Sequence, residues 1–153
     1  MQRSAVLVLC LMAAGAAHAR PPEPVELLKS VPPTCVAERF GRVTVKLGSK
    51  EPNQRTGMNP SPVSYRKAFA KLQKEAGELG GHAVVLRGHD ADFYSKNARV
   101  ARLPTFLQLS GDVVNLKPDL EGCRIVALDA EQFAQDALER EGEKVTLHNT
   151  TVY

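Results

Sequence analysis

Residues 64–87 read SYRKAFAKLQKEAGELGGHAVVLR, and this stretch decides the fold class. Ser61 or Ser64 can cap a helix that begins there, and Gly80-Gly81 is the glycine signal that ends a helix in a left-handed turn. The short, apolar run His82–Arg87 follows at once and is typical of a buried strand. The stretch therefore predicts a helix over residues 65–79 that leads into a central strand. The apolar residues that recur at the three- and four-residue spacing of one helical stripe are Tyr65, Ala68, Phe69, Leu72, Ala76 and Leu79.

Further elements lie on both sides of this unit. Arg42–Gly48 (RVTVKLG) alternates apolar and polar residues, which is the period of a strand with one buried face. Residues 88–102 are polar and predict a hairpin tip or a loose connection. Gly111 predicts a bulge or the close approach of a neighbouring backbone. The remaining expected elements are a solvent loop at residues 49–62, β-like stretches at residues 103–109, 112–116 and 123–128, a helix capped by Asp129 at residues 130–141, and a last stretch at residues 145–153 that pairs or frays.

This order of elements predicts an α+β fold. We expect a small mixed sheet of about four strands, packed by one long helix, with a second helix near the C-terminal end. Residues 20–41 are rich in proline and predict an extended N-terminal arm that packs on the domain rather than folding by itself. Residues 42–153 are long enough to form a single α+β domain with one core.

Residues 1–19 have the order of a cleavable secretory signal peptide. A basic residue, Arg3, precedes an apolar run from Ala5 to Ala17, and Ala17-His18-Ala19 has the small residues of a cleavage site. A helix that spans a membrane needs roughly 20 apolar residues, and this run is shorter. We therefore expect a periplasmic or secreted protein that starts at Arg20 and has no integral membrane segment after cleavage.

The three cysteines differ in their surroundings. Cys10 lies in the leader, where a lipid anchor is the rival interpretation, but lipidation signals place Ala, Gly or Ser just before the cysteine and Leu9 stands there. Cleavage removes Cys10 and leaves Cys35 and Cys123, which an oxidising compartment favours as a disulfide. That bridge closes a loop of about 88 residues and contributes roughly 4 kcal/mol in the chain-entropy model. Two unpaired buried thiols are the alternative.

Charge and motifs exclude several classes of function. The chain has 20 Lys and Arg residues and 17 Asp and Glu residues, a net charge of +3, and the two signs are interspersed. A nucleic-acid-binding protein gathers its basic residues on one face or in one run, so we expect no nucleic-acid partner. The sequence contains no Gly-x-Ser-x-Gly elbow, phosphate-binding loop or Cys-x-x-Cys pair. We therefore predict no catalytic residues and no cofactor.

One polar cluster could bind a metal: His82, His89, Asp90 and Asp92. Imidazole and carboxylate ligands could hold zinc or copper if the polar connection folds back over the start of the strand. The spacing matches no standard ligand motif, and the favoured interpretation is an ordinary polar loop. A periplasmic metal-binding protein is kept as the alternative function.

The helix with its exit, together with FLQLSGDVVNL at residues 106–116, resembles a recurring arrangement in small bacterial envelope proteins. There a helix ends in a "GANAV" type turn into a strand, a polar hairpin follows, and a "GxAV" type strand closes the unit. Gly81–Val84 and Gly111–Val114 stand at those two places here. Over residues 40–118 the chain is similar to the RcsF-type stress sensors of the outer membrane and to the related YbjQ-like small domains. The resemblance implies their fold and no catalytic residues.

The expected function is that of a small exported, non-enzymatic accessory or sensor-like binding domain. Recognition often resides in loops on a rigid scaffold, which points to Ser49–Pro62 and Gly88–Arg102 as the working surface. The expected partner is an envelope protein or a small ligand. Exposed edges of so small a sheet also allow a homo-oligomer.

Overall fold

The computed structural model describes residues 24–96, 99–138 and 144–150. The signal peptide expected at residues 1–19, with Cys10, lies outside these residues. Among the helices of the described ranges, none has both the length and the apolar character needed to cross a membrane.

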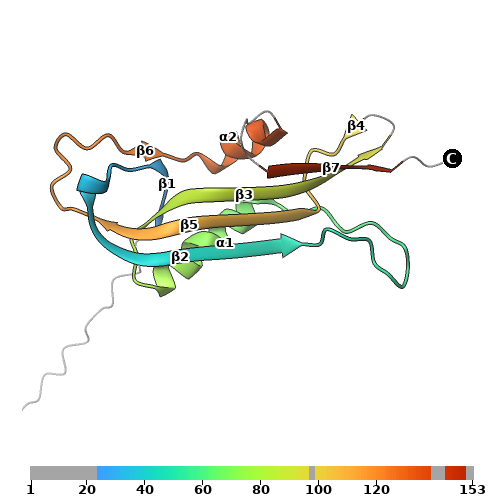
Figure 1. Cartoon of the computed structure of the whole chain (residues 1–153), viewed down its shortest axis with the longest axis horizontal. Coiled ribbons are helices and arrows are strands. Elements are labelled where there is room, and N and C mark those ends of the chain that lie inside the picture. The colour runs from blue at the N-terminus through green and yellow to red at the C-terminus, as the bar shows by residue number, and fades with distance from the viewer. Residues whose placement is uncertain (1–23, 97–98, 139–143, 151–153) are drawn as a thin grey trace, which may run out of the picture.

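The described residues form one mixed sheet of seven strands (Figure 1). β2 pairs antiparallel with β5, β5 pairs antiparallel with β3, and β1 runs parallel to β3. Two more strands, β4 and β7, also pair with β3. Along the main path the order is β2 (Val36–Gly48), β5 (Phe106–Leu116), β3 (Ala83–Lys96), β1 (Glu26–Ser30) and β6 (Val126–Ala127), and the two additional strands are β4 (Arg99–Val100) and β7 (Lys144–Thr150).

Two α-helices cover one face of this sheet. α1 (Tyr65–Glu78) lies behind the sheet in the view of Figure 1, and α2 (Ala130–Gln135) packs against it through Phe133, whose ring meets Phe69 edge-on at 5.5 Å between centroids. Short 3-10 turns, η1 (Pro33–Cys35) and η2 (Asp136–Leu138), precede β2 and follow α2.

α1 agrees with its sequence pattern except at the last position of the predicted stripe, Leu79, which is the C-cap residue and is exposed. The residues of the predicted stripe from Tyr65 to Ala76 are buried, and Gly80 ends the helix with a φ of 86°. Ser64 is the N-cap residue by position, without a side-chain hydrogen bond to the helix. Asp129 caps α2 as predicted, because its carboxylate accepts hydrogen bonds from two backbone N–H groups. Residues 139–141 of the expected second helix lie outside the described ranges.

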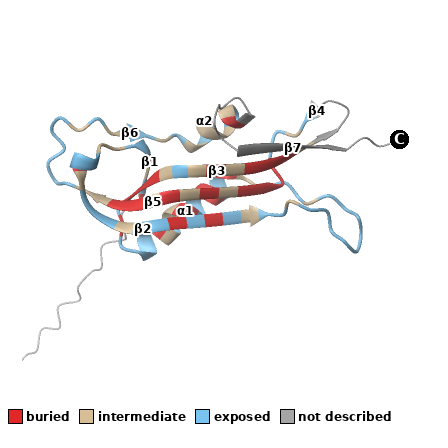
Figure 2. Cartoon of the chain, viewed as in Figure 1, coloured by how far each residue is buried: buried red, intermediate tan, exposed pale blue. Residues whose placement is uncertain are grey.

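The core has two parts, one on each face of the sheet. The larger part lies between the sheet and the helices and includes Phe69, Leu72, Phe93 and Leu109. On the opposite face a smaller cluster lies at one end of the sheet. Figure 2 shows buried positions concentrated on β3 and β5, whereas β2 alternates between buried and exposed residues. The smaller cluster consists of Leu28, Ala83, Val85 and Val114, with Val31, Val36, Leu116 and Ile125 packed against it.

The predicted α+β fold with a mixed sheet and a second, C-terminal helix is confirmed, but the sheet has more strands than the four expected. Two of the additional strands, β1 and β7, lie near the two ends of the described chain. The segment expected as a proline-rich arm at residues 20–41 contributes β1 and the first part of β2. β1 pairs with β3 in parallel register and buries Leu28. At the other end, β7 pairs with the second half of β3.

Residues 88–102, expected to form a hairpin tip or a loose connection, contain a hairpin between β3 and β4. The strand is longer than expected, because β3 continues to Lys96. A register shift between Leu86 and Gly88 interrupts the alternation of buried residues, which resumes after Gly88. The two expected stretches around Gly111 form one strand, β5. A Cβ atom on Gly111 would lie 3.0 Å from the Val85 carbonyl oxygen, which confirms the predicted close approach of a neighbouring backbone.

Candidate functional site

The four residues predicted as metal ligands lie on β3 or just before it. His82 precedes the strand, is exposed, and donates its backbone N–H to the Asn115 side chain at 2.9 Å. His89, Asp90 and Asp92 lie in the second half of β3, roughly 20 Å further along. Because successive strand residues point to opposite faces, Asp90 and Asp92 share one face and His89 lies on the other.

His89 belongs to the core beneath the helices. Its side chain is buried, and its Nε2 atom lies 2.7 Å from the Tyr65 hydroxyl, with which it shares a hydrogen bond. The ring of Phe133 packs edge-on against the imidazole at 5.1 Å between centroids. Along β3 the register with β1 ends at Val85 and the register with β7 begins at Asp90. His89 therefore lies where the neighbouring strand changes, and α2 covers that place.

Asp90 and Asp92 lie on the opposite face beside Lys50, from the loop after β2. The Lys50 ammonium donates a hydrogen bond to Asp90 Oδ2 at 2.9 Å and lies 3.8 Å from Asp92 Oδ2. It also lies 4.5 Å from the centre of the Phe106 ring, within the range of a cation–π contact. The hydrogen bond with Asp90 raises the pKa of Lys50 above its ordinary 10.5, although desolvation acts in the opposite direction. These contacts attach the start of the loop to the sheet.

The structure does not bring the predicted metal ligands together. His82 is separated from the others along the strand, and His89 is separated from the two aspartates by the sheet itself. In the described part of the chain, no three or more His, Cys, Asp or Glu side chains are grouped so that they could hold a metal ion. The geometry supports a packing role for His89 and an ion-pairing role for Asp90 and Asp92.

A second charged group crosses three strands. Asp112 of β5 lies between Arg42 of β2 and Arg87 of β3, which donate hydrogen bonds from their Nε atoms at 2.8 Å and 2.9 Å. Partial burial by itself would raise the pKa of Asp112, but the hydrogen bonds and charges of the two arginines outweigh it and hold the pKa below its ordinary 3.8. Two guanidinium groups face one carboxylate, so this group carries one positive charge in excess.

These side chains are part of a larger surface, which we call the polar face. It lies on the side of the sheet opposite α1 and consists of three rows across β2, β5 and β3. These rows follow the strand register except at Arg87, which lies in the register shift between Leu86 and Gly88. The middle row has small residues, Thr44, Ser110 and Gly88, and it separates two rows of long polar or charged side chains. All nine positions are exposed or half-buried in the described structure. The outer rows are Arg42, Asp112 and Arg87 on one side and Lys46, Gln108 and Asp90 on the other.

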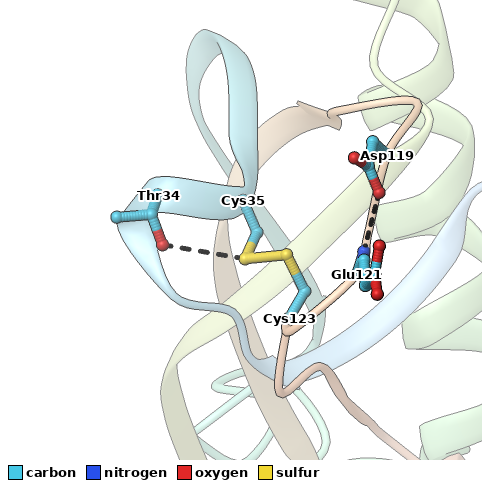
Figure 3. Close-up of a disulfide and its surroundings, with 5 residues drawn as sticks. All are labelled: Thr34, Cys35, Asp119, Glu121 and Cys123. Carbon is cyan, nitrogen blue, oxygen red and sulfur yellow. Dashed lines mark hydrogen bonds between the residues drawn. A yellow bond between two sulfur atoms is a disulfide. The ribbon is translucent and has the colours of Figure 1, made fainter.

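At one end of the sheet the same face is apolar, and a disulfide joins two segments that flank this apolar cluster (Figure 3). Cys35 and Cys123, which are 88 positions apart, are bonded with their Cα atoms 6.0 Å apart, so the predicted pairing is confirmed. Asp119 accepts a hydrogen bond from the Glu121 backbone N–H in the turn before Cys123. Lys117 donates its backbone N–H to the carbonyl of Cys35 at 3.0 Å. The bridge thus holds the segment after β5 against the turn before β2.

Sequence reasoning did not identify the polar face. It proposed the loops Ser49–Pro62 and Gly88–Arg102 as the working surface, and of these only the first is a loop throughout. A signal was present in the polar positions of RVTVKLG and in the alternation of Gln108, Ser110 and Asp112 along the next strand of the sheet. The alternation shows that one face is polar, whereas the partners of each charge depend on register.

No family model matches the chain, and no curated protein matches it.

Proposed function

We propose that this chain is a small exported, non-enzymatic binding domain of the accessory or sensor-like type, which contacts an envelope partner through its polar face. The observation that carries the proposal is the polar face itself, where ordered charged side chains from β2, β5 and β3 lie on a sheet surface opposite the helices. The resemblance to the RcsF-type sensors supports a role in the envelope.

The geometry of the polar face suits binding for two reasons. First, Arg42, Asp112 and Arg87 are held in one arrangement by their ion pairs, so less side-chain entropy is lost when a partner contacts them. Second, the small residues of the middle row, Thr44 and Ser110 among them, let a partner approach the sheet backbone more closely than the flanking rows do. The excess positive charge of the arginine pair favours an anionic group on the partner.

The disulfide supports export and a rigid scaffold. Structural disulfides persist in oxidising compartments, which agrees with the leader expected at residues 1–19. Val36 and Ile125, which lie close in sequence to the two cysteines, pack against the apolar part of the same sheet face. The polar face therefore continues from a fixed, packed part of the sheet, and a partner can bind it without ordering a loop.

Site-specific photo-crosslinking in the native envelope tests this proposal. A photoreactive residue at position 44, in the middle of the polar face, should give a discrete crosslinked product. The matched control carries the same residue at position 74 on the outer side of α1, where Lys74 is exposed, and should give none. Equal products from both positions, or none from position 44, would contradict the assignment of the polar face as the binding surface.

A further inference from the structure

β2 is an edge strand of the sheet. In the residues that the structure describes, it pairs as a strand only with β5, so alternate backbone N–H and C=O groups on its other side face away from the sheet. Such an edge is a template for the addition of another strand. β2 is also long, running from Val36 to Gly48.

The two halves of β2 differ in how well they could accept a strand. In the first half the register with β5 shifts twice, between Val36 and Glu38 and between Arg39 and Gly41. Such bulges twist an edge and hinder further pairing. From Arg42 to Gly48 the register with β5 is continuous. This second half is the part of the edge that could pair with another chain over several residues.

The side chains of this regular half define what could bind there. Arg42, Thr44 and Lys46 lie on the polar face and are exposed, whereas Val43 and Val45 are buried on the face toward α1. The Arg42 guanidinium forms an ion pair with Asp112, and no ion pair involving Lys46 occurs among the described residues. An added strand would therefore meet two cationic side chains on one face and apolar side chains on the other.

Charge decides between the two obvious occupants, a second copy of this chain and a different peptide. If two copies of β2 paired antiparallel about Thr44, Arg42 of each would lie opposite Lys46 of the other, and like charges directly opposite one another are destabilising. Acidic side chains at those two positions would instead form cross-strand ion pairs. The charges of this edge therefore disfavour pairing between two copies of β2 and are complementary to those of an acidic strand.

We propose that the Arg42–Gly48 edge of β2 binds an extended acidic peptide segment of the partner by strand addition. This inference rests on the proposed function and names the chemistry of the partner segment. Since Arg42 and Lys46 are four positions apart on one face, the segment needs acidic residues four positions apart, with apolar residues at the odd positions between them. Backbone hydrogen bonds supply affinity, and the acidic residues set register and specificity.

The test uses the intact disulfide-bonded chain and a blocked, fluorescent heptapeptide, Glu-Val-Thr-Val-Glu-Val-Thr. We expect saturable binding by fluorescence anisotropy and slower amide hydrogen exchange in residues 42–48 of the bound protein. Lys46→Glu should weaken binding roughly threefold to tenfold, which is the range expected when a cross-strand attraction becomes a repulsion. Lys29→Glu, which makes the same charge change on β1 at the other side of the sheet, should leave binding unchanged.

Two modified peptides separate strand addition from simple charge attraction. The first is N-methylated at alternate amides, either at the odd or at the even positions. Only one of these two sets points toward the β2 edge, so methylation of that set should abolish binding. The second peptide has lysine in place of each glutamate and should not bind the unmodified chain. The inference is overturned if the glutamate peptide does not bind, or if it binds without protecting residues 42–48. It is also overturned if β2 is protected in a dimer of this chain without peptide. A crosslink from position 44 together with any of these results would leave the proposed function standing and remove only the strand-addition mode.

Discussion

Asp112 shows at the scale of single residues how the register creates an interaction that neither strand shows by itself. Its carboxylate lies opposite Arg42 on one side and next to Arg87 on the other, and each guanidinium uses a different oxygen. His89 shows the reverse case, because alternation separates it from the carboxylate of its own neighbour, Asp90, and directs it to Tyr65. The chemistry of each polar residue thus depends on its face more than on its position along the chain.

Asp112→Asn should lower the free energy of unfolding by about 1 kcal/mol near neutral pH, since it weakens two partly exposed ion pairs. The pKa of Asp112 is lower in the folded chain than its ordinary 3.8. Its ion pairs therefore stabilise the fold fully above that value and lose their contribution as the pH falls through the lower, folded-state pKa. Urea unfolding of both proteins should show a difference near neutral pH that disappears in strong acid.

Salt and a matched variant check the origin of this difference. High salt should reduce the effect of Asp112→Asn, because exposed ion pairs are screened. Glu38→Gln removes a carboxylate charge from an exposed position of β2 for which the structure describes no ion pair, and it should change stability little. An Asp112→Asn effect that is independent of both pH and salt would show that the carboxylate acts through packing.

At the scale of elements, the two glycines near the end of α1 have opposite requirements. Gly77 lies inside the helix, and a Cβ atom there would meet the Val25 side chain at 3.4 Å, an ordinary van der Waals contact. Gly80 lies just after the helix with a φ of 86°, a conformation that other residues adopt only at a cost. The same substitution should therefore have opposite effects at two positions three residues apart.

Gly80→Ala should destabilise the protein by about 1–2 kcal/mol, the cost of a left-handed conformation for a residue with a Cβ atom. Gly77→Ala should stabilise it by up to about 1 kcal/mol through higher helix propensity. Thermal unfolding followed by circular dichroism measures both. If Gly80→Ala were neutral, the chain after α1 would have to leave the helix by a different turn, and the predicted role of Gly80-Gly81 would be wrong.

The elements that could be predicted are those whose signals are local. α1 could be predicted to within a residue at its end because its stripe, glycine stop and length all lie in one short stretch. β1 could not, since its five residues become a strand through parallel pairing with Ala83–Val85, far along the chain. The continuation of β3 beyond Arg87 could not be predicted for another reason. The register shift between Leu86 and Gly88 breaks the two-residue period by which strands are recognised in a sequence.

At the scale of the whole molecule, the two faces of the sheet differ: one packs against the helices, and the other is divided into an apolar part and a polar part. Residues of both helices pack against the first face and form the larger part of the core with it. The second face is apolar and closed at the end where the chain enters the sheet, and it is polar at the centre. The Cys35–Cys123 bridge could be predicted because Cys10, the third cysteine, falls in the leader expected at residues 1–19. The apolar cluster on this face could not be predicted, since β1, β3 and β5 contribute to it from distant parts of the sequence.

Replacing both cysteines by serine should therefore destabilise the closed end more than the polar face. Loss of a bridge that spans 88 positions should cost about 4 kcal/mol in the free energy of unfolding, because the unfolded chain gains entropy. In the folded variant, amide hydrogen exchange should become faster in residues 117–125, which contain Cys123 and end at Ile125 of the apolar cluster, while exchange at the centre of β3 should follow global stability alone. Urea unfolding with and without reductant supplies the control, since reductant should reproduce the loss in the native protein and leave the variant unchanged. Equal acceleration of exchange throughout the sheet would mean that the bridge acts only on the unfolded state, and that the apolar cluster closes this end of the sheet without it.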